Sequence, residues 1–227
     1  MTAPSHYVLK SGKYSSHARI LERMPAMNEH ARVLDVGGGE GYLASALHAR
    51  GYQVTCLAAP GTVSPAIPTA VEVLESDLDL AFPEMTPGFR YIVCGDVIEH
   101  VRDPSRLLLW LRGLLSPGGE IVASLPNSGH WFFRLNVMLG RFPAEDRGLF
   151  DRTHLHFYTW KGWSSLFGES GLVLDSVEPT PIPFGLALGL ADFHPLVRFC
   201  EAANYYFAGL WKSLLAYQFV VTARPRD

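Results

Sequence analysis

Short runs of hydrophobic and β-branched residues recur along the chain, and stretches with helix-like spacing separate them. Glycine, proline or polar clusters bound each run, as they commonly bound strands. The seven runs with strand-like composition are Arg32–Val36, Gln53–Leu57, Val71–Glu75, Tyr91–Cys94, Glu120–Leu125, Val173–Val177 and Tyr217–Ala223. Because strands that alternate with helices usually form a parallel sheet covered by those helices, the pattern predicts an α/β fold.

Three of the intervening stretches carry signals for the start or the end of a helix. The first spans about residues 42–49. The second begins with Asp103 as N-cap and Pro104 at the first helical position, and the turn at residues 116–119 ends it. The third spans about residues 159–170.

The segment between the last two strands is apolar and rich in aromatic residues. From Ile182 to Ala223 it holds four charged residues and nine aromatic ones. Hydrophobic residues recur after Pro195 at intervals of three and four, which predicts an amphipathic helix. These residues are Leu196, Phe199, Cys200, Ala203, Phe207, Leu210, Trp211 and Leu214. Charged residues interrupt the segment, so it lacks the pattern of a transmembrane helix.

We consider several interpretations of this apolar segment. It could be a helix that packs on the sheet or that joins two copies in a homodimer. It could also be a lid over an apolar acceptor pocket, or a peripheral contact with the membrane interface through residues 182–215, because Trp and Tyr are favoured there.

Composition limits the classes to which the protein can belong. Its 227 residues are enough for one α/β domain, and a hydrophobic content of 48% excludes intrinsic disorder. The formal net charge is −3 and no Lys/Arg block is present, so we expect no nucleic acid partner. Three widely spaced cysteines fit a reducing compartment. No apolar run follows Lys10 and Lys13, so we expect no signal peptide and a cytoplasmic protein.

The first predicted strand leads into a glycine-rich turn and then into a helix. The turn contains Gly37, Gly38, Gly39, Glu40 and Gly41. Such a turn lets a ligand approach the backbone and the amides of the following helix. Its G-x-G-x-G spacing differs from the G-x-G-x-x-G of dinucleotide enzymes, which disfavours a nicotinamide oxidoreductase. An ordinary tight turn remains the alternative.

Two separated motifs resemble the class I S-adenosylmethionine-dependent methyltransferases. Residues 33–41 look like the first motif of that family, and residues 91–104 look like its fourth strand and the loop after it. The resemblance covers about residues 14–178. Within the family, residues 124–131 and 151–159 are most similar to the branch of the methionine-pathway and ubiquinone-type methyltransferases.

The resemblance implies a fold and a cofactor. The fold would be a Rossmann-like, doubly wound sheet of seven strands, mostly parallel, with an antiparallel last strand. Residues 1–227 would form one methyltransferase domain, with the cofactor-binding core at 14–178 and an apolar helical insertion at 179–216. S-adenosylmethionine would be the cofactor and S-adenosylhomocysteine the product.

The resemblance also implies which residues bind the cofactor. Three glycines would lie against its methionine part, two residues after the third strand would hold the adenine, and two at the end of the fourth strand would close the site. The residues implied are Asp35, Gly37, Gly39, Gly41, Asp77, Leu78, Asp96 and Val97, with Tyr14 as a cover. Asp35 would fix the turn or the cofactor's amino group. Solvated loop positions are the alternative for Asp77 and Tyr14.

The end of the second strand departs from the family pattern. In the family this strand ends in an acid that binds both ribose hydroxyls, whereas this chain has Ala58. Three prolines and Gly61 occupy residues 60–68, where a helix normally follows. We therefore expect a rearranged adenosine side of the pocket and weakened cofactor binding.

Histidines supply the candidate chemistry. Their ordinary pKa suits removal of a proton from an acceptor hydroxyl near neutral pH. We predict His100 as the first candidate base and His156 as the second. His100 could instead bond a loop carbonyl and hold the turn after the fourth strand. The predicted substrate contacts are Asn127, His130, Trp131 and His154, and Trp131, Phe132, Phe133 and Met138 would form an apolar rim.

Metal binding is a weaker interpretation of the same residues. Glu99 could orient His100 or join it on a metal, and His154, His156 and Asp151 have a spacing that could ligate one. Such spacings are common by chance, so we predict no metal site.

The function that these features favour is methyl transfer from S-adenosylmethionine to a small or lipophilic acceptor, most readily at oxygen. The alternative is a non-catalytic relative that keeps the fold, binds the cofactor weakly and acts as an interaction protein. Ala58 and the proline-rich loop are the features that support the alternative.

Overall fold

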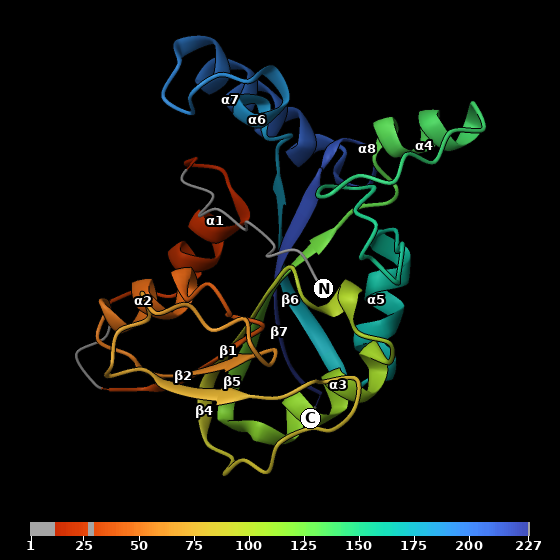
Figure 1. Ribbon diagram of the computed structural model, residues 1–227. Helices are drawn as coiled ribbons and strands as arrows, with labels where there is room; N and C mark the ends of the chain where they lie inside the picture. Colours follow the sequence, from red (N-terminus) through yellow and green to blue (C-terminus); the bar gives the residue numbers. More distant parts are fainter. Residues whose placement is uncertain (1–11, 27–29, 227) are drawn as a thin grey trace.

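Seven strands form one mixed sheet at the centre of this computed structural model, which describes residues 12–26 and 30–226 (Figure 1). The N-terminal stretch for which we expect no signal peptide, residues 1–11, lies outside the described residues. The strands are β1 (Arg32–Val36), β2 (Gln53–Ala58), β3 (Glu72–Glu75), β4 (Phe89–Gly95), β5 (Leu115–Pro126), β6 (Leu172–Thr180) and β7 (Gln218–Pro225). Their order is β3-β2-β1-β4-β5-β7-β6. Strand β7 is antiparallel to both neighbours and β1 to β5 are parallel, which confirms the predicted sheet.

Strand β5 differs most from its predicted bounds. It begins at Leu115, directly after a helix, because Leu115 pairs with Phe89 before the register shifts and Tyr91 pairs with Glu120. Gly118 has a φ of 73° within the residues that bulge out. The predicted turn at residues 116–119 is therefore a bulge inside the strand.

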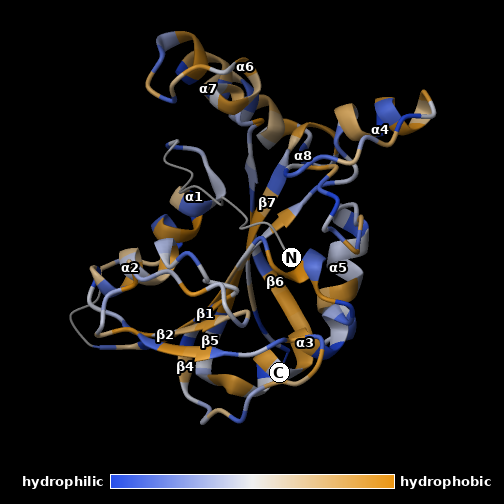
Figure 2. Cartoon of the chain, viewed as in Figure 1, coloured by the Kyte–Doolittle hydropathy of each residue, from blue (hydrophilic) through white to orange (hydrophobic). Residues whose placement is uncertain are grey.

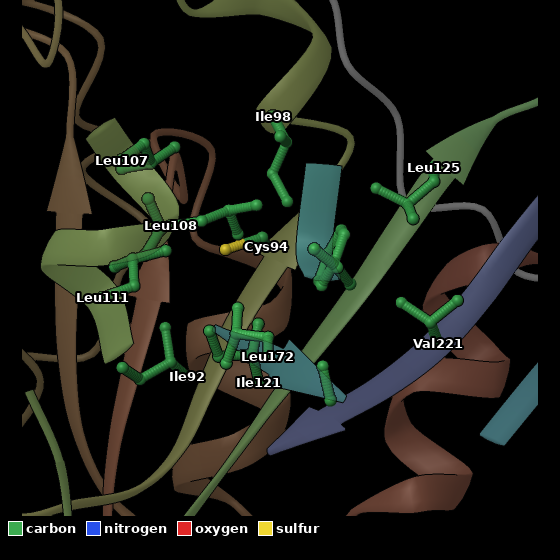
Figure 3. Packing of buried hydrophobic residues seen from close by; sticks show 14 of the residues in the cluster. Ile92, Cys94, Ile98, Leu107, Leu108, Leu111, Ile121, Leu125, Leu172 and Val221 are labelled. Atoms are coloured by element: carbon green, nitrogen blue, oxygen red, sulfur yellow. The ribbon is translucent and has the colours of Figure 1, made fainter. Parts of the chain in front are cut away.

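Helices cover both faces of the sheet (Figure 1). They are α1 (Ser16–Arg23), α2 (Tyr42–His48), the 3-10 helix η1 (Ile98–His100), α3 (Pro104–Leu114), α4 (Trp131–Met138), α5 (Trp160–Glu169), α6 (Phe184–Leu188), α7 (Pro195–Leu210) and α8 (Lys212–Leu215). Leu43 and Leu47 of α2 belong to the core on one face. On the other face, Figure 3 shows Leu108 of α3 near Cys94 of β4. The sheet therefore separates two hydrophobic cores.

Helix α3 begins as its sequence predicts. The Asp103 carboxylate accepts a hydrogen bond of 2.9 Å from the backbone N–H of Arg106, and Pro104 occupies the first turn. Thr159 is the N-cap of α5 by position, although its side chain makes no capping bond. No helix lies between β2 and β3, which agrees with the proline-rich sequence of that loop.

The strand order reverses direction between β1 and β4. From β1 the chain proceeds outward to β2 and β3, and it then returns to β4 on the opposite side of β1. Open α/β sheets bind ligands at such a switch point, beyond the carboxyl ends of the strands. In this chain the glycine turn at residues 37–41 and helix η1 follow β1 and β4 at that end.

Helices α4, α6, α7 and α8 lie at this same end of the sheet (Figure 1). Gln218 at the start of β7 pairs with Pro126 at the end of β5 and with Thr180 at the end of β6. The segments that follow β5 and β6 therefore emerge together. None of the helices in the described part of the chain has the length and apolarity needed to cross a membrane.

Candidate active site

The glycine turn is packed closely against two other segments, the residues after β4 and the loop after β2. Gly37 and Gly41 have φ angles of 76° and 72°, which glycine adopts without strain. A Cβ on Gly37 would lie 2.5 Å from the side chain of Val97, and a Cβ on Gly39 would lie 2.6 Å from Oγ1 of Thr62. A Cβ on Gly41 would overlap the side chain of an isoleucine in the loop after β2. Substitution at these glycines would therefore displace neighbouring segments. Val97 lies beside the turn, and its role in closing the cofactor site remains a prediction.

Asp35 is the buried carboxyl beneath this turn. Gly41, the N-cap of α2, has no side chain, and the Asp35 carboxyl instead accepts a hydrogen bond from the backbone N–H of Ala44 in the first turn. Oδ2 of Asp35 is buried and has no hydrogen-bond partner among the described residues. Desolvation by burial outweighs the Ala44 bond and raises the pKa of Asp35 to about 7. The position predicted to fix the turn therefore caps the following helix.

Ala58 occupies the end of β2, where the family pattern has an acid. Its register partner on β3 is Glu75, whose exposed carboxylate accepts a 3.0 Å hydrogen bond from the backbone N–H of Gly61. The next residue, Thr62, is the one that contacts Gly39. A carboxylate from the neighbouring strand therefore lies close to the place where the acid is missing.

The other predicted cofactor residues have structural contacts of their own. Oδ1 of Asp77 accepts a 3.0 Å hydrogen bond from the N–H of Asp79, and Leu78 packs against the core cluster. Tyr14 stacks on Tyr205 of α7 with ring centres 4.7 Å apart and lines a cavity of about 520 Å³ beside that helix. Their contacts with a cofactor remain predictions.

Asp96, which follows β4, forms hydrogen bonds with residues at the ends of two other strands. It has a φ of 55°, a left-handed conformation that aspartate tolerates better than most residues. Its Oδ1 accepts hydrogen bonds of 2.6 Å from Oγ of Ser124 and 2.9 Å from Nε2 of Gln218. Because these partners lie on β5 and β7, the carboxylate of Asp96 organises the sheet end next to Val97, and its role toward a cofactor remains a prediction.

The two histidine-bearing segments meet at helix η1. The backbone carbonyl of Glu99 accepts hydrogen bonds from the N–H groups of Leu155, at 2.9 Å, and His156, at 3.3 Å. These bonds hold the loop before α5 against the end of β4, although more than fifty residues separate them in the chain. The structure thus places the first candidate base, His100, next to the loop that carries His154 and His156.

His100 is held in one orientation by Thr153. Its Nδ1 lies 3.1 Å from both the carbonyl oxygen and Oγ1 of Thr153, and Oγ1 donates to Oδ1 of Asp151 at 2.6 Å. Because a carbonyl oxygen can only accept, Nδ1 of His100 carries a proton, and in the neutral ring Nε2 therefore holds the lone pair. His100 therefore makes the loop-carbonyl bond that we considered as an alternative, and this bond leaves Nε2 available as a base.

His154 is buried beside Glu99 and His100. Its Nε2 lies 3.9 Å from Oε1 of Glu99, and its ring centre lies 4.7 Å from that of His100. The Glu99 side chain is fully buried. Each of the three residues offers a ligand atom within 4.8 Å of the others, a spacing that a divalent cation could also use. The absence of a metal site therefore remains a prediction.

His156 is oriented by a backbone carbonyl. Its Nε2 donates to the carbonyl oxygen of Val101 at 2.9 Å, and its ring stacks on that of Tyr158. In the neutral ring Nδ1 is then the nitrogen with the lone pair. This second candidate base therefore retains a lone pair, and its catalytic role remains a prediction.

Asn127 is fully buried and has a structural role. Its Nδ2 donates to the carbonyl oxygens of Ala216, at 2.7 Å, and Ser213, at 3.3 Å, and its Oδ1 accepts from the N–H of Gly129 at 2.9 Å. Both amide protons are therefore used in joining the end of β5 to α8. This geometry favours the turn-cap alternative over a substrate contact.

His130 and Trp131 begin helix α4. Nδ1 of His130 accepts from the N–H of Phe132 at 3.3 Å, and its Nε2 is buried without a hydrogen-bond partner among the described residues. Burial lowers the pKa of His130 to about 4, so the ring is neutral at pH 7. Trp131 is 41% exposed. The substrate role predicted for each of them remains untested by these contacts.

Thr153 and Glu75 are the main additions to the predicted site. The sequence contained a signal for Thr153, because an Asp-x-Thr turn precedes His154 and such turns fix nearby backbone groups. Glu75 could have been found from the pairing of the parallel strand ends, since an acid closes the third predicted strand beside the missing one.

Comparison with known proteins identifies the family. A family model described as a methyltransferase domain matches residues 12–177. A ubiquinone biosynthesis O-methyltransferase of Xanthomonas oryzae pv. oryzae is 37% identical over an alignment of 122 residues that covers 50% of this chain and 51% of that protein. This chain therefore spans about half the length of the curated relatives that it matches.

Solved structures share the fold. An S-adenosylmethionine-dependent methyltransferase of Mesorhizobium loti has a TM-score of 0.60 at 17% identity, with 92% of this chain and 98% of that chain covered. The 1,6-didemethyltoxoflavin-N1-methyltransferase of Burkholderia thailandensis has a TM-score of 0.57 at 14% identity, with 93% and 77% covered. Because the family model spans well over half of the sequence, this chain belongs to the S-adenosylmethionine-dependent methyltransferases.

Proposed function

We propose that this chain transfers the methyl group of S-adenosylmethionine to an oxygen atom of a small or lipophilic acceptor. The observation that carries the proposal is the orientation of His100, because its Nδ1 is bonded to Thr153 and its Nε2 retains the lone pair. The ring follows β4 at the switch point of the sheet, close to Val97, which contacts the glycine turn. The name of the Xanthomonas relative supports oxygen as the methylated atom.

The residues around the turn fit the cofactor on its methionine side. The glycine turn would hold the methionine part, and below that turn Asp35 presents a buried oxygen that has no hydrogen-bond partner among the described residues. On the adenosine side we propose that Glu75 replaces the missing acid, because its carboxylate is exposed and is paired in register with Ala58. Asp77 would lie beside the adenine.

The cofactor, when bound, supplies an electrophilic methyl group on a sulfonium. Nε2 of His100 would take the proton of the acceptor hydroxyl, which makes the oxygen more nucleophilic. Thr153 and Asp151 would act as positioning residues, since they fix the tautomer and the ring plane of His100. The buried Glu99 carboxylate, which lies close to His100 and His154, would stabilise the positive charge that the His100 ring then carries.

Binding and transfer distinguish the catalyst from a non-catalytic relative. We expect S-adenosylhomocysteine to bind in calorimetry with a dissociation constant in the micromolar to hundred-micromolar range, about 8 to 5.5 kcal/mol. Label from the methyl group of S-adenosylmethionine should then pass to a lipid extract. Binding without transfer to small-molecule or lipid fractions would favour the non-catalytic relative. An absence of heat at millimolar ligand would remove the cofactor from the proposal.

Replacement of Glu75 by Ala is expected to weaken S-adenosylhomocysteine binding by about tenfold or more, because a charge-assisted hydrogen bond contributes roughly 1.5–3 kcal/mol. Calorimetry measures the change. Glu72→Ala is the matched control, because Glu72 is an exposed acid of the same strand whose carboxylate accepts from Oγ1 of Thr55. Equal affinities for wild type and Glu75→Ala would refute this assignment, whereas Ala58→Asp should restore binding in the Glu75→Ala variant.

A further inference from the structure

The hydrophobic stripe of α7 faces away from the body of the protein. The buried residues of this helix are Val197, Glu201 and Ala208. The stripe predicted from the sequence lies elsewhere on the helix: Phe199 is 71% exposed and Leu210 is 70% exposed. The helix is therefore amphipathic, but much of its hydrophobic face is exposed and not covered by any element among the described residues.

Helix α4 and the residues after it expose a second set of hydrophobic side chains. Met138 is 78% exposed and Phe142 is 56% exposed. We call the two sets together the apical surface. Its exposed members are Trp131, Phe132, Leu135, Val137, Met138, Leu139, Phe142, Leu186, Leu188, Phe193, Leu196, Phe199, Tyr206, Phe207, Leu210 and Trp211. Figure 2 shows that α4 and α6 to α8 carry hydrophobic residues at the upper end of the molecule, beyond the sheet.

The exposed charged residues on these helices are all basic. Arg134 of α4, Arg198 of α7 and Lys212 of α8 are exposed, whereas the one acid on the four helices, Glu201, is 8% exposed. Outside the helices, the exposed acids near these residues in the sequence are Asp192 before α7 and Glu145 and Asp146 after Phe142, and the latter two lie between the exposed Arg141 and Arg147. Helices that combine aromatic and aliphatic residues with basic side chains bind at the surface of anionic bilayers.

We propose that the apical surface docks on an anionic lipid bilayer. Trp131, Trp211 and Tyr206 would lie at the level of the headgroups, which aromatic residues of this kind favour. The basic side chains would pair with lipid phosphates. A second copy of the chain is a poorer occupant, because a two-fold contact through this surface would bring its basic side chains toward one another.

Docking in this orientation turns the site toward the bilayer. The apical surface lies at the carboxyl end of the sheet, as do the glycine turn and His100, and Asn127 joins the start of the α4 segment to α8. A lipophilic acceptor could then reach the site from the membrane. This last consequence rests on the proposed function, whereas the docking itself does not.

Sedimentation with lipid vesicles tests the docking without any cofactor, so its failure is distinct from a failure of methyl transfer. The full chain should sediment with vesicles of phosphatidylcholine and phosphatidylglycerol, and less with phosphatidylcholine alone. Added salt should weaken the binding, because it screens the contribution of the basic residues. The double variant Phe199→Ser, Trp211→Ser should bind at least roughly tenfold more weakly than the wild type, because two large apolar side chains are lost from the contact.

Leu109→Ser is the matched control, because Leu109 is a 48% exposed leucine on α3, away from the apical surface, and its loss should leave vesicle binding unchanged. Urea unfolding should confirm that both variants are folded, as expected for exposed positions. The proposal is overturned if the wild type does not bind anionic vesicles at low salt. It is also overturned if size-exclusion chromatography shows a dimer that the double variant dissociates and that excludes vesicle binding.

Discussion

Replacement of His100 by Ala is expected to lower the rate of methyl transfer by about 10²–10⁴-fold, the usual contribution of a positioned general base. The affinity for S-adenosylhomocysteine should change little, because the proton is removed from the acceptor and not from the cofactor. The rate of label transfer from S-adenosylmethionine to the acceptor fraction measures the first effect, and calorimetry measures the second.

A conservative variant separates catalysis from loop placement. His100→Asn keeps a side-chain N–H for the carbonyl of Thr153 but provides no base, so it should be as slow as His100→Ala. If the Asn variant instead kept the wild-type rate, His100 would serve to hold the loop before α5. His30→Ala is the matched control, because His30 is an exposed histidine before β1.

Local pattern was sufficient for most of the sheet and for the glycine turn. Alternation of hydrophobic runs predicted each strand, because a strand buried between two helical layers needs apolar residues on both faces. The start of α3 was also predictable, since Asp103 and Pro104 act within one helical turn. The largest difference in bounds is the early start of β5, because its bulge depends on pairing with Phe89 of another strand; β6 also continues three residues beyond its predicted end.

The candidate site could be predicted in its parts but not in its assembly. The backbone bonds from Leu155 and His156 to Glu99 join segments that are distant in the chain, and no local pattern encodes such a contact. The same limit explains Asn127, whose amide bonds reach Ser213 and Ala216 rather than a ligand. Long-range partners decide whether a polar side chain is free to act.

Helix α7 shows a further limit of periodicity. The spacing of its hydrophobic residues predicted the helix, which is present from Pro195 to Leu210. Spacing does not determine which face is buried. Here the helix packs on the protein through Val197 and Ala208, while Phe199 and Leu210 remain exposed. The apolar composition of this segment therefore describes a surface and not only a core.

Replacement of Asp35 by Asn is expected to stabilise the protein at alkaline pH relative to the wild type. Burial raises the pKa of Asp35 from 3.8 to about 7, so the folded state binds more protons than the unfolded state between these values. The contribution of Asp35 to the free energy of unfolding is therefore largest below about pH 4 and falls as pH rises to 7. The total loss is about 4 kcal/mol, at 1.36 kcal/mol per pKa unit.

Asn has the same shape and can accept the hydrogen bond from Ala44, but it carries no charge to bury. The difference in unfolding free energy between Asp35→Asn and wild type should therefore grow by about 4 kcal/mol between pH 4 and pH 8, as measured by urea unfolding. Parallel curves for Asp35→Asn and wild type would mean that Asp35 is not desolvated. Asp35 is expected to lower stability at neutral pH because its charge is buried below the glycine turn. Such a costly buried carboxyl is typical of a binding site, in which its charge interacts with a ligand.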